Sequence, residues 1–195
     1  PYSAALLNVS AMSYGALSSN AILALNGAAK KGNFYHNTGE GGISRFHKQP
    51  GGDICWNIGT GYFGCRNPDG TFNETMFKEN ALLPQVKMLE IKLSQGAKPA
   101  HGGILPGQKL TAAIAEARGI DLATWGQKDV QSPPRHSAFS GPQGLIEFVA
   151  RLRDLSGGKP VGFKLCVGSP VEMAAIVHAM IELNVTPDFI TVDGG

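Results

Sequence analysis

The sequence predicts an α/β protein built from parallel β-α-β units. Short apolar runs of strand length alternate along the chain with segments whose apolar residues recur at helical spacing. The strands read as buried runs, which is typical of strands covered by helices. This pattern fits either an open doubly wound sheet or a closed (β/α) barrel. We count five strand-helix repeats and no linker-like tract, so residues 1–195 are expected to form one domain, which is partial if the fold is a barrel of about 250 residues.

The chain opens with two short strands around a helix. Residues 7–12 are an apolar run of strand length, and Ser19 begins a polar cap before the helical pattern of residues 21–31. Residues 33–37 form the next strand. Both strands run into small or polar residues, so we expect their carboxyl ends to contribute to a shared ligand site.

The middle of the chain combines an excursion, a helix and a third strand. Residues 54–64 alternate apolar and polar side chains and precede an Asn-Pro-Asp-Gly turn, a composition that predicts a hairpin. Asn73 or Thr75 caps the next helix, which continues to Leu83. Residues 88–94 are the third strand.

The remaining elements alternate between helix and strand. Alanine-rich residues 111–118 form a short helix that Gly119 ends, and residues 131–136 are extended because each proline restricts its predecessor. The last elements are a helix capped by Ser140, a strand over residues 160–166, a helix from Ser169-Pro170 and a strand over residues 189–192. The helix after Ser140 carries one apolar face, made of Leu145, Phe148, Val149 and Leu152.

Composition argues against several classes of protein. Charged residues are 16% and hydrophobic residues 43% of the chain, which indicates a compact fold and not a solvated or disordered one. The basic residues are scattered and the net charge is +2, so a nucleic-acid partner is not expected. The 26 glycines, about twice ordinary usage, collect in loops after strands, where they indicate site architecture.

The cysteines and the apolar runs bear on location. Cys55, Cys65 and Cys166 are far apart, so neither a disulfide framework nor a zinc site is indicated, and a reducing, cytoplasmic compartment is expected. The longest apolar stretch, residues 173–183, falls short of the ~20 residues that span a bilayer. Because Pro1 is not an initiator methionine, the sequence leaves open whether a further segment precedes it.

The loop after the third strand carries several side chains that can do chemistry. Gln95, Lys98 and His101 lie there among four glycines, at the end of a strand. Gln95 can donate and accept hydrogen bonds at the edge of a ligand, and Lys98 can bind a carboxylate, although both residue types are also common in solvated loops. Glu40 lies between glycines that permit close ligand approach, or it caps its own turn. Arg118 either binds a carboxylate or stabilises a helix end.

Lys164 is the sharpest single signal in the sequence. It is the one charge in an apolar strand, and an unpaired ammonium there is costly, so it needs an anionic or hydrogen-bonding partner. One interpretation is a lysine that reaches the strand edge, and the other is a cation beside the pyrimidine ring of a flavin. The sequence has no G-x-G-x-x-G after a strand and no P-loop, so nicotinamide Rossmann and nucleotide-hydrolase sites find no support.

Several motifs, in order, resemble one known family. They are S-A-M-S-Y-G-A-L-S, N-T-G-E-G-G, E-I-K-L-S-Q-G-A-K-P, L-P-G, S-P-P-R-H, F-K-L and V-D-G-G. Together they resemble the FMN-binding synthase domain of glutamate synthase, and more closely its stand-alone relatives without the amidotransferase portion. The resemblance implies a (β/α)₈ TIM barrel with FMN at the carboxyl ends of its strands. It also implies reductive amination of 2-oxoglutarate to L-glutamate through 2-iminoglutarate formed with ammonia.

The resemblance carries roles onto individual residues. It implies that Met12 and Ser13 pack on the flavin and that Gln95 and Lys164 lie at its pyrimidine edge. It implies catalytic and substrate-binding roles around 2-oxoglutarate for three further residues: Glu40, Lys98 and Arg118. The family's phosphate-binding loops and its cysteine cluster for iron–sulphur binding correspond to positions after Gly195, so weak FMN binding is expected of residues 1–195 alone.

Two positions depart from the family's pattern and put the substrate in doubt. His101 replaces an acidic residue and Ile104 replaces a substrate-facing amide, and losing such a hydrogen bond costs roughly 1 to 3 kcal/mol. The alternatives are therefore a flavin enzyme acting on another keto or hydroxy acid, and a half-barrel that serves as a non-catalytic subunit. An electron-donor protein or a glutaminase subunit is the partner that the family implies.

Overall fold

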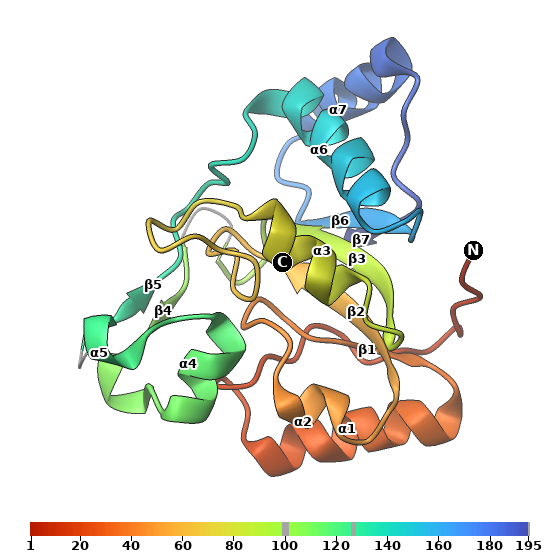
Figure 1. The fold of residues 1–195 in the computed structure, drawn as a ribbon. Helices are drawn as coiled ribbons and strands as arrows, with labels where there is room; N and C mark the ends of the chain where they lie inside the picture. The colour runs from red at the N-terminus through yellow and green to blue at the C-terminus, as the bar shows by residue number, and fades with distance from the viewer. Residues whose placement is uncertain (99–101, 126–127, 195) are drawn as a thin grey trace.

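The computed structural model describes residues 1–98, 102–125 and 128–194 and has an α/β fold (Figure 1). Five parallel strands form one curled sheet in the order β1-β2-β3-β6-β7, consistent with part of a (β/α) barrel. Their bounds are Tyr35–Asn37, Asp53–Ile58, Val86–Lys92, Val161–Leu165 and Ile190–Val192. Two short strands, β4 (Ile104–Leu105) and β5 (Val130–Gln131), form a separate antiparallel pair.

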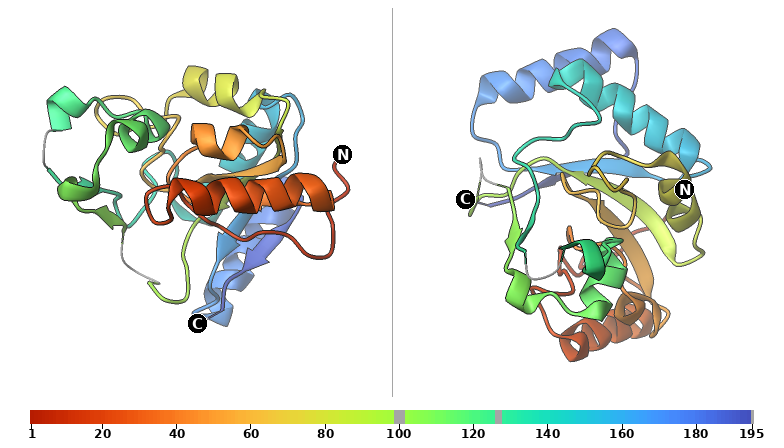
Figure 2. Two further views of the ribbon diagram at one scale, coloured as in Figure 1. Left: turned by 90° about the horizontal axis from the view of Figure 1, so that it is seen from below. Right: turned by 60° about the vertical axis from the view of Figure 1, so that its left-hand side comes forward.

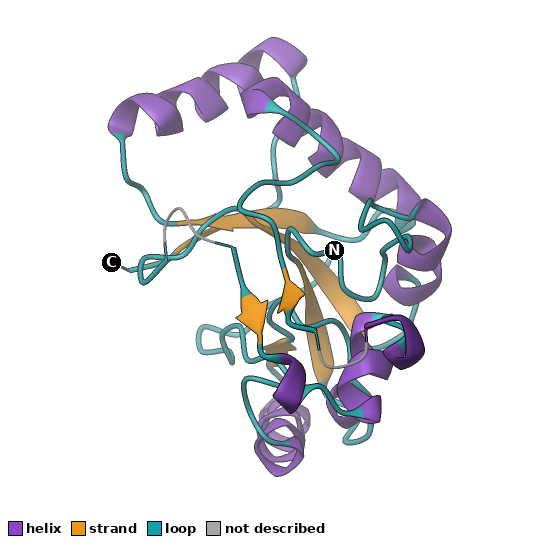
Figure 3. Ribbon diagram, turned by 90° about the vertical axis from the view of Figure 1, so that its left-hand side faces the viewer, coloured by secondary structure: helices purple, strands orange, loops and turns teal. Residues whose placement is uncertain are grey.

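The helices lie around this sheet in two main groups. Figures 2 and 3 show α6 and α7 packed together at one end of the sheet, with α1 and α2 at the other end. A third group, α4 and α5, lies near the β4-β5 pair (Figure 1). The helices are α1 (Ser19–Gly32), α2 (Arg45–Lys48), α3 (Glu74–Ala81), α4 (Ala112–Arg118), α5 (Leu122–Trp125), α6 (Gly141–Leu155) and α7 (Pro170–Leu183). Among the described residues, no helix has both the length and the apolar character that crossing a bilayer requires.

The main core lies between the sheet and the helices that cover it. Leu89 and Ile91 of β3 are fully buried there, together with Phe163 of β6. Because side chains alternate along a strand, Glu90 points to the opposite face of the sheet from Leu89 and Ile91. The predicted apolar face of the helix after Ser140 is confirmed, since all four of its residues are at most 3% exposed: Leu145, Phe148, Val149 and Leu152.

The predicted hairpin at residues 54–64 is wrong, whereas the Asn-Pro-Asp-Gly turn after it is confirmed and lies within a short antiparallel bridge between Arg66 and Phe72. Residues 53–58 are strand β2, which pairs in parallel with β1 and β3 near the middle of the sheet. The alternation arises because Cys55 and Asn57 face the inner side of the curled sheet while Ile54 and Trp56 face the helices, and all four are buried. Polar residues that point into a barrel interior therefore imitate the pattern of a solvent-exposed hairpin.

The first predicted strand, residues 7–12, forms only an isolated bridge. Val9 pairs with His36, its N–H donating to the carbonyl of Tyr35 at 3.0 Å and its carbonyl accepting from the N–H of Asn37 at 3.0 Å. Leu7 is 80% exposed, so the apolar run does not enter the core as a whole. The segment still lies beside β1, and Met12 donates its N–H to the carbonyl of Asn37 at 3.1 Å.

Helix ends follow the predicted capping residues closely. Thr111 accepts from the N–H of Ile114 and begins α4, and Gly119 ends that helix in the left-handed region at φ 66°. Asn73, not Thr75, caps α3. Ser18 caps α1 one residue before the predicted position. Ser140 occupies the cap of α6 without a side-chain hydrogen bond.

Two buried histidines lie between β1 and the first helices. His36 and His47 are both 0% exposed, and their ring centroids are 5.0 Å apart. The Nε2 of His47 donates to the carbonyl of Met12 at 3.1 Å, so its Nδ1 accepts from the N–H of Ser44. Burial lowers the pKa of His36 to about 3 and that of His47 to about 4. Both rings are therefore neutral in the folded protein near pH 7.

These two histidines make the fold sensitive to acid. The unfolded chain binds protons at its histidines below about pH 6.5, whereas the folded chain does not until about pH 4, so stability is lost as the pH falls through this window. Replacing His36→Leu in the intact protein should reduce the loss of unfolding free energy between pH 7 and pH 4.5 by about 2 kcal/mol. Urea unfolding at both pH values measures this difference. The control is His178→Gln at an exposed position, and an unchanged pH dependence in His36→Leu would contradict the prediction.

Candidate functional site

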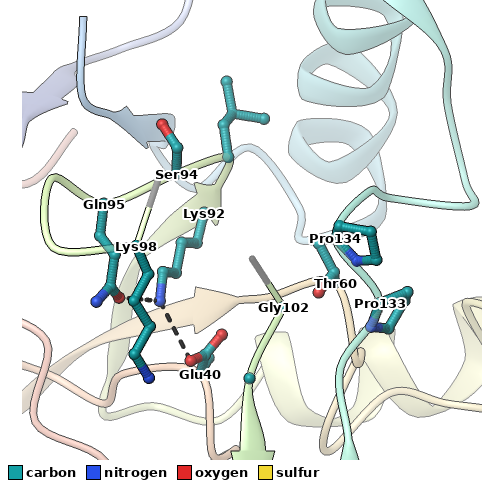
Figure 4. Close-up of a pocket in the computed structure, with 11 residues that line it drawn as sticks. Glu40, Thr60, Lys92, Ser94, Gln95, Lys98, Gly102, Pro133 and Pro134 are labelled. Atoms are coloured by element: carbon teal, nitrogen blue, oxygen red, sulfur yellow. Dashed lines mark hydrogen bonds and ion pairs between the residues drawn. The ribbon is translucent and has the colours of Figure 1, made fainter. Parts of the chain in front are cut away.

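The carboxyl ends of β1, β2 and β3 open onto a cavity lined by charged and polar side chains (Figure 4). Parallel strands place all their carboxyl ends at one edge of the sheet, so loops from different strands meet there. The polar side chains in its wall are Glu40, Thr60, Lys92, Ser94, Gln95 and Lys98. Three of these were predicted from the sequence, and the structure brings them together: Glu40, Gln95 and Lys98.

Lys92 lies at the centre of this cavity. Its Nζ is 3.2 Å from Oε1 of Glu40 and donates to Oε1 of Gln95 at 2.5 Å, as Figure 4 shows. Its side chain is only 15% exposed, so the ion pair with Glu40 is poorly screened by solvent. Sequence reasoning missed Lys92 because its strand also carries Lys87 and Glu90, so Lys92 is not the lone charge that makes Lys164 stand out.

The ion pair depends on a glycine in the next loop. A Cβ added at Gly59 would lie 2.8 Å from Cβ of Glu40 and 3.2 Å from its Oε2. The absence of a side chain after β2 therefore leaves room for Glu40 itself. Gly39 plays a similar part, since it has φ +62° and a Cβ there would lie 2.8 Å from the backbone nitrogen of Ser13.

Arg118 belongs to a second cavity that adjoins the first. Glu40, Lys98 and Gly103 line both, and Ser13 lies with Arg118 in the second. Arg118 is 8% exposed, and its guanidinium lies 4.6 Å from the centre of the Phe63 ring. Burial lowers the pKa of Arg118, and the charge of Glu40 opposes that shift. Among the described residues, its Nε has no hydrogen-bond partner.

Lys109 and Ile104 also line the second cavity. Lys109 adds a third basic side chain to those of Lys98 and Arg118, and sequence reasoning did not single it out. Ile104 is 64% exposed, so it presents an apolar side chain beside these cations. His101 lies outside the described residues.

Lys164 has the anionic partner that the sequence required. Its Nζ is 3.5 Å from Oδ1 of Asp193, whose Oδ2 accepts from the N–H of Gly96 at 3.0 Å. Lys164 is also the direct neighbour of Lys92 across the β3-β6 pair. It lines neither of the two cavities, however, and faces a separate hollow on the inner side of the sheet.

The S-P-P-R-H motif forms a wall of the first cavity and is anchored by His136. The Nε2 of this residue donates to the carbonyl of Lys92 at 2.8 Å, so its Nδ1 accepts from the hydroxyl of Tyr62 at 3.0 Å. The Tyr62 oxygen in turn accepts from the N–H of Ala138 at 3.0 Å. This chain of hydrogen bonds holds the prolines of the wall, Pro133 and Pro134, against the end of β3.

A curled parallel sheet with charged side chains gathered at its carboxyl edge is the arrangement of (β/α)-barrel enzymes. The family model described as "Conserved region in glutamate synthase" matches residues 4–195. The chain therefore belongs to the glutamate synthase family, which confirms the resemblance read from its motifs.

Individual relatives agree with this assignment. The chain is 41% identical over 194 residues to the glutamate synthase large subunit-like protein YerD of Bacillus subtilis, covering 99% of this chain and 36% of that protein. It is 34% identical over 187 residues to an archaeal glutamate synthase [NADPH] of Archaeoglobus fulgidus, covering 95% and 32%. It is 32% identical over 185 residues to an archaeal-type glutamate synthase [NADPH] of Thermotoga maritima, covering 94% and 32%. The chain thus spans about a third of the length of these relatives.

The contact between Gly59 and Glu40 can be tested directly. Gly59→Ala should destabilise the intact protein by about 1 to 3 kcal/mol, because the added methyl group overlaps Glu40 and forces it away from Lys92. Thermal or urea unfolding measures this loss. The matched control is Gly168→Ala, where an added Cβ meets no atom within 4 Å. Equal stability of the two variants would show that the loop after β2 adjusts freely.

Proposed function

We propose that this chain is the part of an FMN-dependent oxidoreductase of the glutamate synthase type that carries the substrate site. The proposed reaction is the reductive amination of 2-oxoglutarate to L-glutamate through 2-iminoglutarate. One observation carries this proposal: in a member of the glutamate synthase family, Lys92, Lys98 and Arg118 line two adjoining cavities at the carboxyl edge of the sheet, where Glu40 is the one carboxylate among the described lining residues. This excess of positive charge suits a substrate with two carboxylates.

The residues present also fit a flavin. Lys92 and Lys164 lie side by side at the ends of β3 and β6, each with one carboxylate partner, so their charges suit a ring that becomes negative on reduction. Gln95 would contact the pyrimidine edge, and Met12 and Ser13 would pack beside the ring. When bound and reduced by an electron donor, FMN would supply the hydride for the imine carbon.

The protein side chains would hold and orient the substrate. Arg118 is fixed by its burial and its contact with Phe63, so it would bind a carboxylate with little loss of side-chain freedom. Lys98, from the loop after β3, would bind the other carboxylate. Lys92 forms an ion pair with Glu40 in the cavity that Lys98 also lines. Its ammonium group would therefore donate the proton that the nitrogen of the substrate takes up.

The same proposal extends to the rest of the protein. Residues 1–195 would form part of one barrel domain, because apolar side chains stay exposed at β7 and α7, notably Val192 at 67% and Ile181 at 73%. The iron–sulphur cluster that the family implies would use residues outside this segment. An electron-donor protein or a glutaminase subunit would be the partner, and the cytoplasm the location.

Ile104 favours a second candidate, which is a flavin enzyme acting on a different 2-oxo acid. Its exposed apolar side chain adjoins Leu105 and Pro106 in the wall of the second cavity. Such a wall suits a substrate whose far end is aliphatic and not charged. A non-catalytic half-barrel subunit is a third alternative, and the absence of flavin would favour it.

A visible spectrum of the intact protein, purified without added cofactor, is the first test. Flavin absorption is expected, and after anaerobic reduction it should return when 2-oxoglutarate and ammonium are added together. Reoxidation by a 2-oxo acid with an aliphatic tail, but not by 2-oxoglutarate, would favour the second candidate. If reconstitution with FMN also gives no flavin spectrum, the oxidoreductase proposal is wrong.

The role of Arg118 gives a further prediction. Arg118→Lys should raise KM for 2-oxoglutarate by about tenfold or more, because the buried guanidinium offers two parallel donors and lysine offers one point charge. The control is Lys78→Met, a substitution at an exposed position of α3, which should leave KM unchanged. Steady-state kinetics measures both. If the Arg118→Lys enzyme has an unaltered KM, Arg118 does not bind the substrate and the prediction is wrong.

A further inference from the structure

The inner face of the sheet holds a buried carboxylate that the proposed mechanism does not use. Glu90 of β3 is 2% exposed, and its Oε1 accepts from Nδ2 of Asn37 at 2.8 Å and from Nδ2 of Asn57 at 2.7 Å. Its Oε2 accepts from the hydroxyl of Thr191 at 2.7 Å. Barrel interiors are usually filled by bulky aliphatic side chains, and a buried charge is costly. The presence of this buried polar layer therefore calls for a structural explanation.

The contacts of Asn37 explain why a carboxylate lies at this position. A carboxylate oxygen only accepts, so Glu90 fixes which end of the Asn37 amide carries the nitrogen. The amide oxygen must then point the other way, where it accepts from the N–H of Gly39 at 3.0 Å. Gly39 stands in the left-handed region at φ +62° and directly precedes Glu40. A buried carboxylate thus sets the start of the turn that carries a predicted catalytic residue.

Asn57 supports the same turn from the neighbouring strand. Its side chain donates to Glu90, and its backbone N–H donates to Oγ1 of Thr38 at 3.1 Å. The hydroxyl of Thr38 donates to the carbonyl of Gly39 at 2.9 Å. Two strands therefore connect Glu90 to the backbone on either side of Gly39.

We propose that Glu90 is a positioning residue that, through Asn37, fixes the turn over residues 38–42 and so sets the distance between Glu40 and Lys92. Glu90 and Lys92 are two positions apart on β3, and both point to the inner side of the sheet. One strand thus holds Lys92 and anchors the turn that brings Glu40 to it. The inference rests on the proposed function only for its catalytic consequence, since the anchoring itself can be measured without substrate.

The chemistry of the contacts identifies the informative substitution. In Glu90→Gln, the amide oxygen can accept from both asparagines while the amide nitrogen donates to the hydroxyl of Thr191, which can also accept. The positioning contacts survive and the charge is removed. Glu90→Leu removes all three contacts at similar volume. Thr191→Val removes only the contact to Oε2, so it is the matched control.

Hydrogen–deuterium exchange of the intact protein tests the anchoring. In Glu90→Leu, the Gly39 amide should exchange about tenfold faster than in the natural protein, whereas Glu90→Gln and Thr191→Val should stay within about threefold. Exchange in α1 and α6 reports whether the rest of the fold is intact. Should Glu90→Leu not fold, Asn37→Ala breaks the same link while leaving Glu90 with two donors, and the same acceleration is expected.

Two outcomes would overturn the inference. Unchanged exchange at Gly39 in Glu90→Leu or Asn37→Ala would show that the turn holds itself, and equal acceleration in Glu90→Gln and Glu90→Leu would assign the effect to the charge. In the reoxidation assay, Glu90→Leu should lower kcat with little change in KM for 2-oxoglutarate, and Glu90→Gln should rescue kcat. If no variant reacts with 2-oxoglutarate but the exchange pattern holds, the proposed function fails and the positioning role stands.

Discussion

Alternation along the parallel strands is the constraint on which the rest of the structure depends. In β3, Leu89 and Ile91 enter the core under the helices, while Glu90 and Lys92 face the inside of the curled sheet. A shift of one residue in register would bury the charges under the helices and turn the apolar side chains to the inside of the curled sheet. The same register of the hydrogen-bonded strands therefore places both the core residues and the residues of the candidate site. A change of register would disrupt both.

The inner face is organised in layers that differ in polarity. The middle layer holds Asn37, Asn57 and Glu90, all at most 4% exposed, and the layer above it holds Lys92 and Lys164. Buried polar groups are costly unless they are hydrogen-bonded, and Glu90 accepts from two amides and one hydroxyl, whereas the Oδ1 of Asn57 has no partner among the described residues. The layer below the cations therefore acts as a rigid polar support.

Local patterns in the sequence predicted most of the helices and strands. The features that were missed depend on contacts between residues far apart in the sequence. Thr111, Gly119 and Asn73 end or begin helices through contacts within a few residues, which a sequence pattern reveals. The hairpin error at β2 came from polar residues such as Asn57, whose partner Glu90 lies 33 residues away. The pairing of β4 with β5 was missed for the same reason, since their two strands share no local turn. Of the candidate site, the resemblance supplied Glu40, Lys98 and Arg118, but the central position of Lys92 emerges only when β1 and β3 lie together.

The register of β3 and β6 has a consequence for the energy of the protein. Lys92 and Lys164 are direct neighbours across the two strands, and like charges in that position repel. Glu40 and Asp193 offset part of this repulsion from either side. Loss of either carboxylate would leave one lysine of the pair without its partner and the repulsion across the strands less offset. The two ion pairs, which join four separate segments of the chain, are therefore energetically coupled and contribute to stability as one unit.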